Sequence, residues 1–263
     1  ILFGVELYKP ERSVATSKSQ LLIDIQSASV HEIAFDSEEV DLKLKKVNGK
    51  WLNDDVDSFP VDNDLVDNFL FKLTNLSRGL PVSVSTGSHE RFKVSNRRFE
   101  RKLVLTTESG EEVIVLFGKP ATVRESYARV SKEDSVFAIG LEPWELGNSK
   151  DYWLDKKLFA LDRVDVKSVK VNDLEFVKTE GVFGVVESKQ LEYQQEKIDD
   201  FLDEIFDLRI ESYISSEVEK NNLELFEIRM SVELNDSTLL DYLVEEEKDG
   251  ATYRIRRTDK EGI

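Results

Sequence analysis

Two hydrophobic periods alternate along the chain, one typical of β-strands and one typical of α-helices. In residues 40–45 every second residue is apolar, the pattern of a strand with one buried face. Asn48-Gly49 follows, a pair that favours the type I′ turn of a β-hairpin, and Trp51 lies in the returning stretch. The pattern therefore predicts a hairpin that carries a tryptophan just beyond its turn glycine.

A helical period begins after Pro60. Asp62 can cap the helix, and Asp64 lies in the first turn, where a carboxylate faces the positive end of the helix dipole. The apolar residues that follow recur at helical spacing, and they are Leu65, Val66, Phe69, Leu70, Leu73 and Leu76. This spacing predicts one amphipathic helix over residues 62–76.

Further strand patterns precede and follow this helix. Strands are predicted at 21–25, 30–35, 99–106, 127–130 and 135–139. Residues 113–117 are apolar without alternation, which indicates a strand covered on both faces. Residues 81–98 are mostly polar and are expected to form a loop.

The same order of elements recurs in the second half of the chain. Gly181 and Phe183 follow a strand pattern there, as Gly49 and Trp51 do in the first half, and both pairs have the same separation. This order is common enough to arise by chance, but its near-constant spacing favours an internal duplication.

A second amphipathic stretch follows Phe183 and extends the repeat. Aligning the two apolar stripes pairs Phe69 with Leu202 and Leu73 with Phe206. Alternating strand patterns then come at 228–234, 240–244 and 252–255. The second half is therefore expected to contain a hairpin, a helix and further strands in the order of the first.

The pattern thus predicts an α+β protein of two similar tandem modules, each a mainly antiparallel sheet with one amphipathic helix packed on it. The first module is expected over residues 21–154 and a second, shorter module over residues 155–263. Residues 1–20 form an N-terminal segment that precedes both.

The start of this segment has two interpretations. Residues 1–5 are apolar and are followed by Tyr8 and Lys9. They suit a first strand or an irregular chain end, or else the last turn of a membrane anchor with Tyr8 and Lys9 at the interface. Five apolar residues are far fewer than the roughly 20 that span a bilayer. The residues alone leave the alternatives open.

Composition narrows the classes of function. The chain has 263 residues, of which 40% are hydrophobic and 34% charged, and its net charge is −17. So negative a chain is poorly suited to nucleic-acid phosphates or to an anionic lipid surface, and no nucleic-acid partner is expected. Because the chain contains no cysteine, disulfides, thiolate nucleophiles, zinc–cysteine sites and iron–sulfur clusters are excluded.

The residues that could act in catalysis or bind a metal do not form a complete pattern for either role. His31 and His89 are the two histidines, and neither has the spaced partners of a metal site. The serines near His89 lie outside a Gly-x-Ser-x-Gly elbow, and no phosphate-binding glycine loop occurs. The acidic residues of 54–64 lack the pattern of an EF-hand, although a loose surface cation site stays open. No catalytic residue, cofactor or resident metal is therefore predicted.

The aromatic stretch between the two halves is the candidate partner or ligand surface. Trp144, Tyr152 and Trp153 fall within residues 143–154. Such rings line a groove for a glycan or a peptide, or they fill the space between a sheet and a helix. Trp51 is expected to do the latter, because Phe183 repeats its position ahead of the second helix.

The first half resembles a bacterial family known as domain of unknown function 4340. The resemblance covers about residues 21–176 and is carried by Val-Asn-Gly-Lys-Trp at 47–51, Val-Asp at 61–62, Tyr-Ala-Arg at 127–129, Val-Phe at 136–137 and Trp-Leu-Asp-Lys-Lys-Leu at 153–158. It implies an N-terminal membrane anchor, a location outside the cytoplasm, and frequent pairing with ABC-transporter auxiliary proteins of the gliding-motility type. The family has no assigned enzymatic activity, so it supplies no catalytic residue. The second half departs from the pattern, because Phe183 stands in place of the tryptophan.

These observations lead us to expect a non-catalytic accessory or scaffold protein of an ABC-type transport complex. A single N-terminal anchor would hold it at the bacterial cell membrane, facing the periplasm or the outside, and it would act by binding protein partners. A glycan- or peptide-binding module that uses the aromatic stretch is the first alternative. A hydrolase is the second, and it requires a cleft with two carboxylates about 5–10 Å apart.

Overall fold

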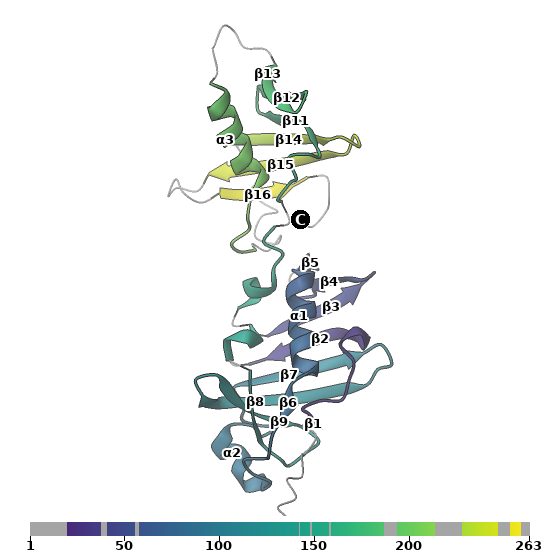
Figure 1. Ribbon diagram of the computed structural model, residues 1–263, viewed down its shortest axis with the longest axis vertical. Helices are drawn as coiled ribbons and strands as arrows, with labels where there is room; N and C mark the ends of the chain where they lie inside the picture. Colours follow the sequence, from purple (N-terminus) through teal and green to yellow (C-terminus); the bar gives the residue numbers. More distant parts are fainter. Residues whose placement is uncertain are drawn as a thin grey trace, which may run out of the picture.

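The computed structural model of the chain describes residues 20–37, 41–55, 58–141, 143–147, 149–157, 159–186, 194–213, 228–246 and 253–258. Figure 1 shows one sheet in each half of the chain, with one long helix beside each sheet. The predicted α+β class and the two similar tandem modules are confirmed.

The first module is built on an eight-stranded antiparallel sheet in the order β10-β9-β8-β7-β2-β3-β4-β5. Its strands are β2 (Val30–Asp36), β3 (Leu42–Val47), β4 (Lys50–Asn53), β5 (Phe59–Pro60), β7 (Arg101–Thr107), β8 (Glu112–Thr122), β9 (Glu125–Val130) and β10 (Phe137–Ile139). A separate two-stranded ribbon joins β1 (Gln20–Leu21) to β6 (Ser77–Arg78). The helical elements are α1 (Asn63–Thr74), α2 (His89–Phe92) and the 3-10 turns η1 (Ser27–Ser29), η2 (Thr86–Ser88), η3 (Pro143–Leu146) and η4 (Lys150–Trp153).

The second module repeats the topology of the first. Its six-stranded sheet has the order β13-β12-β11-β14-β15-β16, which matches the order β4-β3-β2-β7-β8-β9. The strands are β11 (Val166–Val171), β12 (Leu174–Thr179), β13 (Val182–Val186), β14 (Ile228–Leu234), β15 (Leu239–Glu246) and β16 (Tyr253–Arg257), and the helix is α3 (Gln195–Phe206). Among the described residues, β5 and β10 have no counterpart in this second sheet.

Turn chemistry explains why the same hairpin forms twice. Asn48 and Gly49 have φ angles of 51° and 81°, and Glu180 and Gly181 have φ angles of 51° and 86°. Positive φ at both central positions is the requirement of a type I′ turn, whose twist matches that of the flanking strands. The predicted hairpin is confirmed at residues 48–49 and recurs at the same place in the second module.

The two long helices correspond, but the predicted alignment of their apolar stripes is shifted by one position. Both helices contain 12 residues. Aligned from their first residues, they pair Leu70, and not Phe69, with Leu202. In this alignment most buried residues coincide, since Val66, Leu70 and Leu73 correspond to Ile198, Leu202 and Ile205. Buried Phe69 is the exception, because it corresponds to the exposed Phe201. The helices therefore keep the same spacing as the hairpins that precede them.

The predicted N-cap of the first helix is confirmed. An oxygen of Asp62 accepts a hydrogen bond of 3.0 Å from the Leu65 backbone N–H. This bond satisfies one of the N–H groups that the first turn of a helix leaves without a partner in the helix itself. Helix α1 therefore begins where its sequence predicts.

Each module has its own hydrophobic core between sheet and helix. The larger cluster joins α1 to the first sheet and contains Trp51 and Trp153. A separate cluster joins α3 to the second sheet around Phe183 and Leu202. No buried residue belongs to both clusters among the parts of the chain that the structure describes.

Strand β8 is covered on both faces, as the unbroken apolar run at 113–117 predicts. Val115 and Phe117 belong to the main core of the first module. Leu116, between them, points to the other face and packs in a small cluster with Phe92, Val94 and Val136. The covering layer on that face is the chain segment of residues 79–98.

This segment corrects the prediction of a polar loop. It contains η2 and α2, and it buries Phe92 to 7% and Val94 to 0% exposure. Phe92 and Val94 are too few to show a period, and their packing against Leu116 of β8 and Val136 buries them.

The prediction of a strand at 21–25 is also wrong beyond its first residue. Leu21 pairs with Ser77 in the small ribbon, and the chain then turns so that Leu22 and Ile23 both enter the main core. Adjacent residues of a regular strand point to opposite faces, so burying both on one side excludes a strand.

The anchor prediction falls on residues 1–5, which lie outside the described residues. Within the described ranges, no helix has the length and apolar character needed to cross a bilayer.

Candidate functional site

Trp51 lies in β4 at the junction of sheet and helix, and it is 1% exposed. Its indole Nε1 donates a hydrogen bond of 3.1 Å to an oxygen of Asp67 on α1. Its backbone N–H donates to the side-chain oxygen of Asn63, the first residue of that helix, over 2.8 Å. The ring therefore seats α1 on the sheet, as predicted, and is closed to a ligand.

Phe183 occupies the equivalent place in the second module and is 0% exposed. The side chain of Gln195, the first residue of α3, donates to the Phe183 carbonyl over 3.0 Å. The Lys178 ammonium lies 5.7 Å from the Phe183 ring centre, as the Lys46 ammonium lies 5.5 Å from the Trp51 ring. The aromatic plug, its cation and its tie to the helix are thus repeated.

The aspartate that faces the ring has a different hydrogen-bond donor in the second module, where phenylalanine replaces tryptophan. Phenylalanine has no N–H to offer Asp199, which stands where Asp67 stands in the first helix. Arg163 supplies the donor instead, because its guanidinium binds Asp199 and donates over 2.6 Å to Asp203. The hydrogen bond from Arg163, aided by one from Gln195, lowers the pKa of Asp199 below its ordinary value of 3.8.

Trp153 corrects the prediction of an aromatic binding surface. It is 1% exposed, and its ring centre lies 5.3 Å from the ring centres of both Phe35 and Phe69. Gly147, at a φ of 68°, passes so close that a Cβ there would lie 2.5 Å from the indole Nε1. The connector between the modules folds inward here, and the Trp153 carbonyl accepts a hydrogen bond of 2.9 Å from the Asp62 N–H. Trp153 is a core residue and cannot meet a partner.

Of the other two aromatic candidates, only Tyr152 has a described side chain. Tyr152 is half-buried, with its ring edge-on to Trp153 at 4.9 Å. Burial raises the pKa of its hydroxyl, and the nearby negative charge of Glu145 adds to the rise. The backbone of Trp144 lies in η3, and its side chain lies outside the described part of the structure.

The histidine and serine candidates have structural partners. His89 is 8% exposed, and its Nε2 lies 2.8 Å from the Asp134 carbonyl oxygen. The Ser88 hydroxyl donates to the Ser85 carbonyl over 2.7 Å. Ser88 and His89 therefore bond to other groups and do not form a Ser-His pair. Within the described residues, no three histidine, aspartate or glutamate side chains come together in a way that could hold a metal ion.

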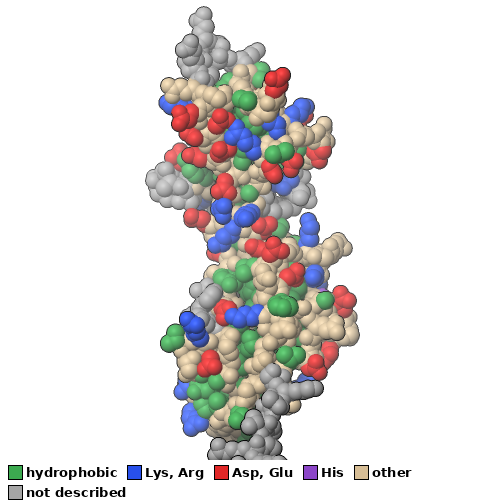
Figure 2. Space-filling model, viewed as in Figure 1, with side chains coloured by type: hydrophobic (Ala, Val, Ile, Leu, Met, Phe, Trp, Pro, Cys, Tyr) green, Lys and Arg blue, Asp and Glu red, His purple; other side chains and the backbone are tan. Residues whose placement is uncertain are grey.

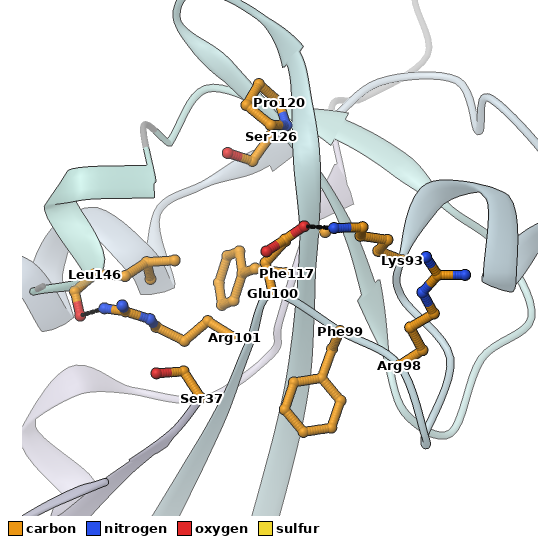
Figure 3. A pocket seen from close by; sticks show the side chains of 11 residues that line it. Ser37, Lys93, Arg98, Phe99, Glu100, Arg101, Phe117, Pro120, Ser126 and Leu146 are labelled. Atoms are coloured by element: carbon orange, nitrogen blue, oxygen red, sulfur yellow. Dashed lines mark hydrogen bonds and ion pairs between the residues drawn. The ribbon is translucent and has the colours of Figure 1, made fainter. Parts of the chain in front are cut away.

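A hollow of about 360 Å³ lies beside the start of β7, and Figure 3 shows its lining side chains. They are Ser37, Lys93, Arg98, Phe99, Glu100, Arg101, Phe117, Pro120, Ser126 and Leu146, with the backbone of Gly118. Lys93 forms an ion pair with Glu100, and Arg101 donates to the Leu146 carbonyl over 2.9 Å. Glu100 is the one carboxylate among these lining residues, so the hollow lacks the two converging acids of a glycosidase.

Arg129 is a buried charge to which no pattern in the sequence assigns a role. It is 3% exposed in β9, and its guanidinium donates to the carbonyls of Val94, Ser131 and Glu133 over 2.8–2.9 Å. A fourth bond of 2.6 Å reaches the side-chain oxygen of Asn96. Burial lowers the Arg129 pKa, and the charge of Asp134 partly opposes this. The residue fastens the turn at 94–96 onto the sheet beside the hollow. The one signal in the sequence that could have found Arg129 is its charge among the apolar residues of the predicted strand at 127–130.

Comparison with known proteins gives one match. The model of the family described as Domain of unknown function (DUF4340) matches residues 51–225. The matched region begins at Trp51 in β4 and includes the connector, the hairpin of the second module and α3. No curated protein and no solved structure matches the chain significantly.

Proposed function

Because the chain belongs to the DUF4340 family, we propose that it is a non-catalytic accessory or scaffold protein of an ABC-type transport complex. An N-terminal anchor holds it at the bacterial cell membrane, with both modules facing the periplasm or the outside. It acts by binding protein partners, among them transporter auxiliary or membrane subunits. The resemblance to this family, which implies frequent pairing with such auxiliary proteins, supports the proposal.

The observation that carries the proposal is the extent of the family match. It spans parts of both modules and the connector between them, so the family unit includes the tandem arrangement. Two modules of one topology in series offer a long surface for partners. Three of the large aromatic rings, Trp51, Trp153 and Phe183, are buried in the cores. Recognition is therefore assigned to the charged and polar side chains of the outer faces.

The first alternative, a glycan- or peptide-binding module, depends on three aromatic rings, and one of them is buried. This alternative relies on exposed aromatic faces that stack on the ligand, and Trp153 has none. No observation in the described residues favours the second alternative, a hydrolase, over a binding role.

Affinity purification from the native host tests the proposal. The tagged, full-length gene product is expected to fractionate with membranes and to enrich ABC-type transporter subunits when extracted with mild detergent. A tagged extracytoplasmic protein of similar size and net charge serves as the control for acidic surfaces. Enrichment of the same subunits by both baits, or of partners unrelated to transport, would overturn the proposal.

A further inference from the structure

The far end of the first module is formed by residues 79–98, which follow β6 and lie at the lower end of Figure 1. The segment is fixed to the sheet at several points. The Val82 N–H donates to the Val136 carbonyl over 2.8 Å, and His89 lies against the Asp134 carbonyl. Gly118 of β8 allows the closest approach, because a Cβ at this position would lie 2.0 Å from the Phe92 carbonyl oxygen. The surface that this segment presents is thus built on a defined scaffold.

Three apolar side chains of this segment lie on the surface. Leu80 is 88% exposed, Val82 45% and Val84 67%. Scattered exposed apolar residues need no explanation, but these three alternate along one short stretch and form a local patch. Inward packing uses Phe92 and Val94 instead, so the three exposed side chains contribute little to the fold.

The same segment is basic, although the chain carries a net charge of −17. Residues 79–98 contain one acidic residue, Glu90, and four basic residues, Arg91, Lys93, Arg97 and Arg98, and Arg78 of β6 directly precedes them. Arg78 and Lys93 form ion pairs with Glu133 and Glu100. Arg91, Arg97 and Arg98 are exposed and form no ion pair with any other described residue. Figure 2 shows basic and hydrophobic side chains close together at the lower left of the molecule.

We propose that this end of the first module lies against an anionic lipid bilayer. Apolar side chains that enter the interface beside cations that meet lipid phosphates are the two parts of peripheral membrane binding. The acidic remainder of the chain is repelled by the same surface, so the molecule stands with its basic end toward the bilayer. The exposed apolar patch favours lipid over a nucleic acid, which would use the cations alone.

The position of the N-terminal side of the chain agrees with this orientation. Gln20, the first described residue, pairs with Arg78 in the β1–β6 ribbon, directly before the basic segment. The chain therefore enters the first module at the end assigned to the bilayer. The inference rests on the proposed membrane tether and adds to it the surface that faces the lipid. It also departs from the expectation, drawn from the net charge, that the chain is poorly suited to an anionic lipid surface.

Single labelled cysteines test the orientation, and the cysteine-free chain makes each label unique. Leu80→Cys and Val84→Cys are labelled with a polarity-sensitive fluorophore, and Val164→Cys, at a 73% exposed position of the second module, is the matched control. With phosphatidylglycerol-containing vesicles, the emission of the first two is expected to shift to the blue and that of the control to stay unchanged. No shift at either position, or an equal shift at Val164, would overturn the proposal.

Vesicle sedimentation tests the charges. In the full chain, Arg91, Arg97 and Arg98 are all replaced by Gln, and the control replaces the exposed Lys150, Lys170 and Lys197 by Gln. The first variant is expected to partition onto anionic vesicles at least about tenfold more weakly than the unchanged chain, and the control about as strongly as the unchanged chain. Circular dichroism confirms that both fold. Equal partitioning of the first variant and the unchanged chain would refute the lipid contact.

Different results would refute the transport role and the lipid-facing surface. Transporter subunits are purified in detergent, where no bilayer is present, so they report on partner binding alone. A negative vesicle result with intact co-purification refutes only the lipid-facing surface. A positive vesicle result without transporter subunits refutes only the transport role.

Discussion

At the scale of single residues, one aromatic side chain in each module decides how its helix sits on its sheet. Trp51 and Phe183 are both fully buried, yet they satisfy the facing aspartate differently. The indole donates to Asp67 directly, whereas Arg163 crosses the Phe183 ring at 5.4 Å to reach Asp199. Loss of the indole N–H is thus compensated by a cation that also stacks on the ring.

Trp51→Phe is expected to lower the free energy of unfolding of the first module by about 1–3 kcal/mol. The substitution removes one hydrogen bond and leaves a small cavity, but Asp67 is exposed and regains its hydration. Trp51→Ala is the companion variant and is expected to cost about 3–5 kcal/mol. Urea unfolding followed by circular dichroism measures both. Equal losses for the two variants would show that the hydrogen bond, and not the ring, holds the helix.

At the scale of elements, local patterns decide which segments become helices and strands, and close backbone contacts decide how they layer. Helix α1 follows from its cap and period, and both hairpins follow from positive φ at their turns. Neither a helical period nor a turn signal predicts the conformation of residues 79–98. They cover β8 because Arg129 binds the turn at 94–96 and because Gly118 leaves room for the Phe92 carbonyl.

Gly118→Ala is therefore expected to destabilise the first module by about 2–3 kcal/mol, since the added methyl group overlaps backbone that cannot yield without moving α2. Gly140→Ala is the matched control. A Cβ at Gly140 meets nothing within 4 Å, and its expected effect is within about 0.5 kcal/mol. Thermal unfolding measures both, and amide hydrogen exchange over residues 89–98 is expected to rise only in the Gly118 variant. Unchanged exchange there would show that the segment does not depend on this contact.

At the scale of the whole molecule, the chain consists of two separately packed cores joined by a short connector. Contacts between the halves are few and specific among the described residues. The rings of Phe59 and Tyr213 lie 4.7 Å apart, and the Tyr213 N–H donates to an Asp151 carboxylate oxygen over 3.4 Å. Separate cores with a small interface are expected to unfold as separate units.

The position of the tryptophans makes this testable without mutation. Trp51 and Trp153 lie in the first core, Trp144 lies in the connector, and the sequence has no tryptophan after position 153. Tryptophan fluorescence therefore reports on the first module, whereas circular dichroism reports on both. Urea unfolding curves from the two probes are expected to have different midpoints. Superimposable curves would show that the modules unfold as one cooperative unit.

Much of the architecture could be predicted from the chain because it depends on neighbours in sequence. Alternation, helical spacing, Asn48-Gly49 and the Asp62 cap act over a few consecutive residues, and their recurrence revealed the second module. The candidate site was predicted poorly. The aromatic stretch at 143–154 has the composition of a core and of a groove alike, and only the packing of Trp153 between Phe35 and Phe69 distinguishes them.

The sequence by itself determined the two repeated modules, their hairpins and helices, and the burial of Trp51. The tertiary structure alone decided that Trp153 is internal, that Arg129 is caged by carbonyls, and that residues 79–98 form a basic and apolar end. Those features join residues that lie far apart in the chain, such as Val94 and Arg129. Such contacts depend on how the sheet brings distant strands together, and no local period records them.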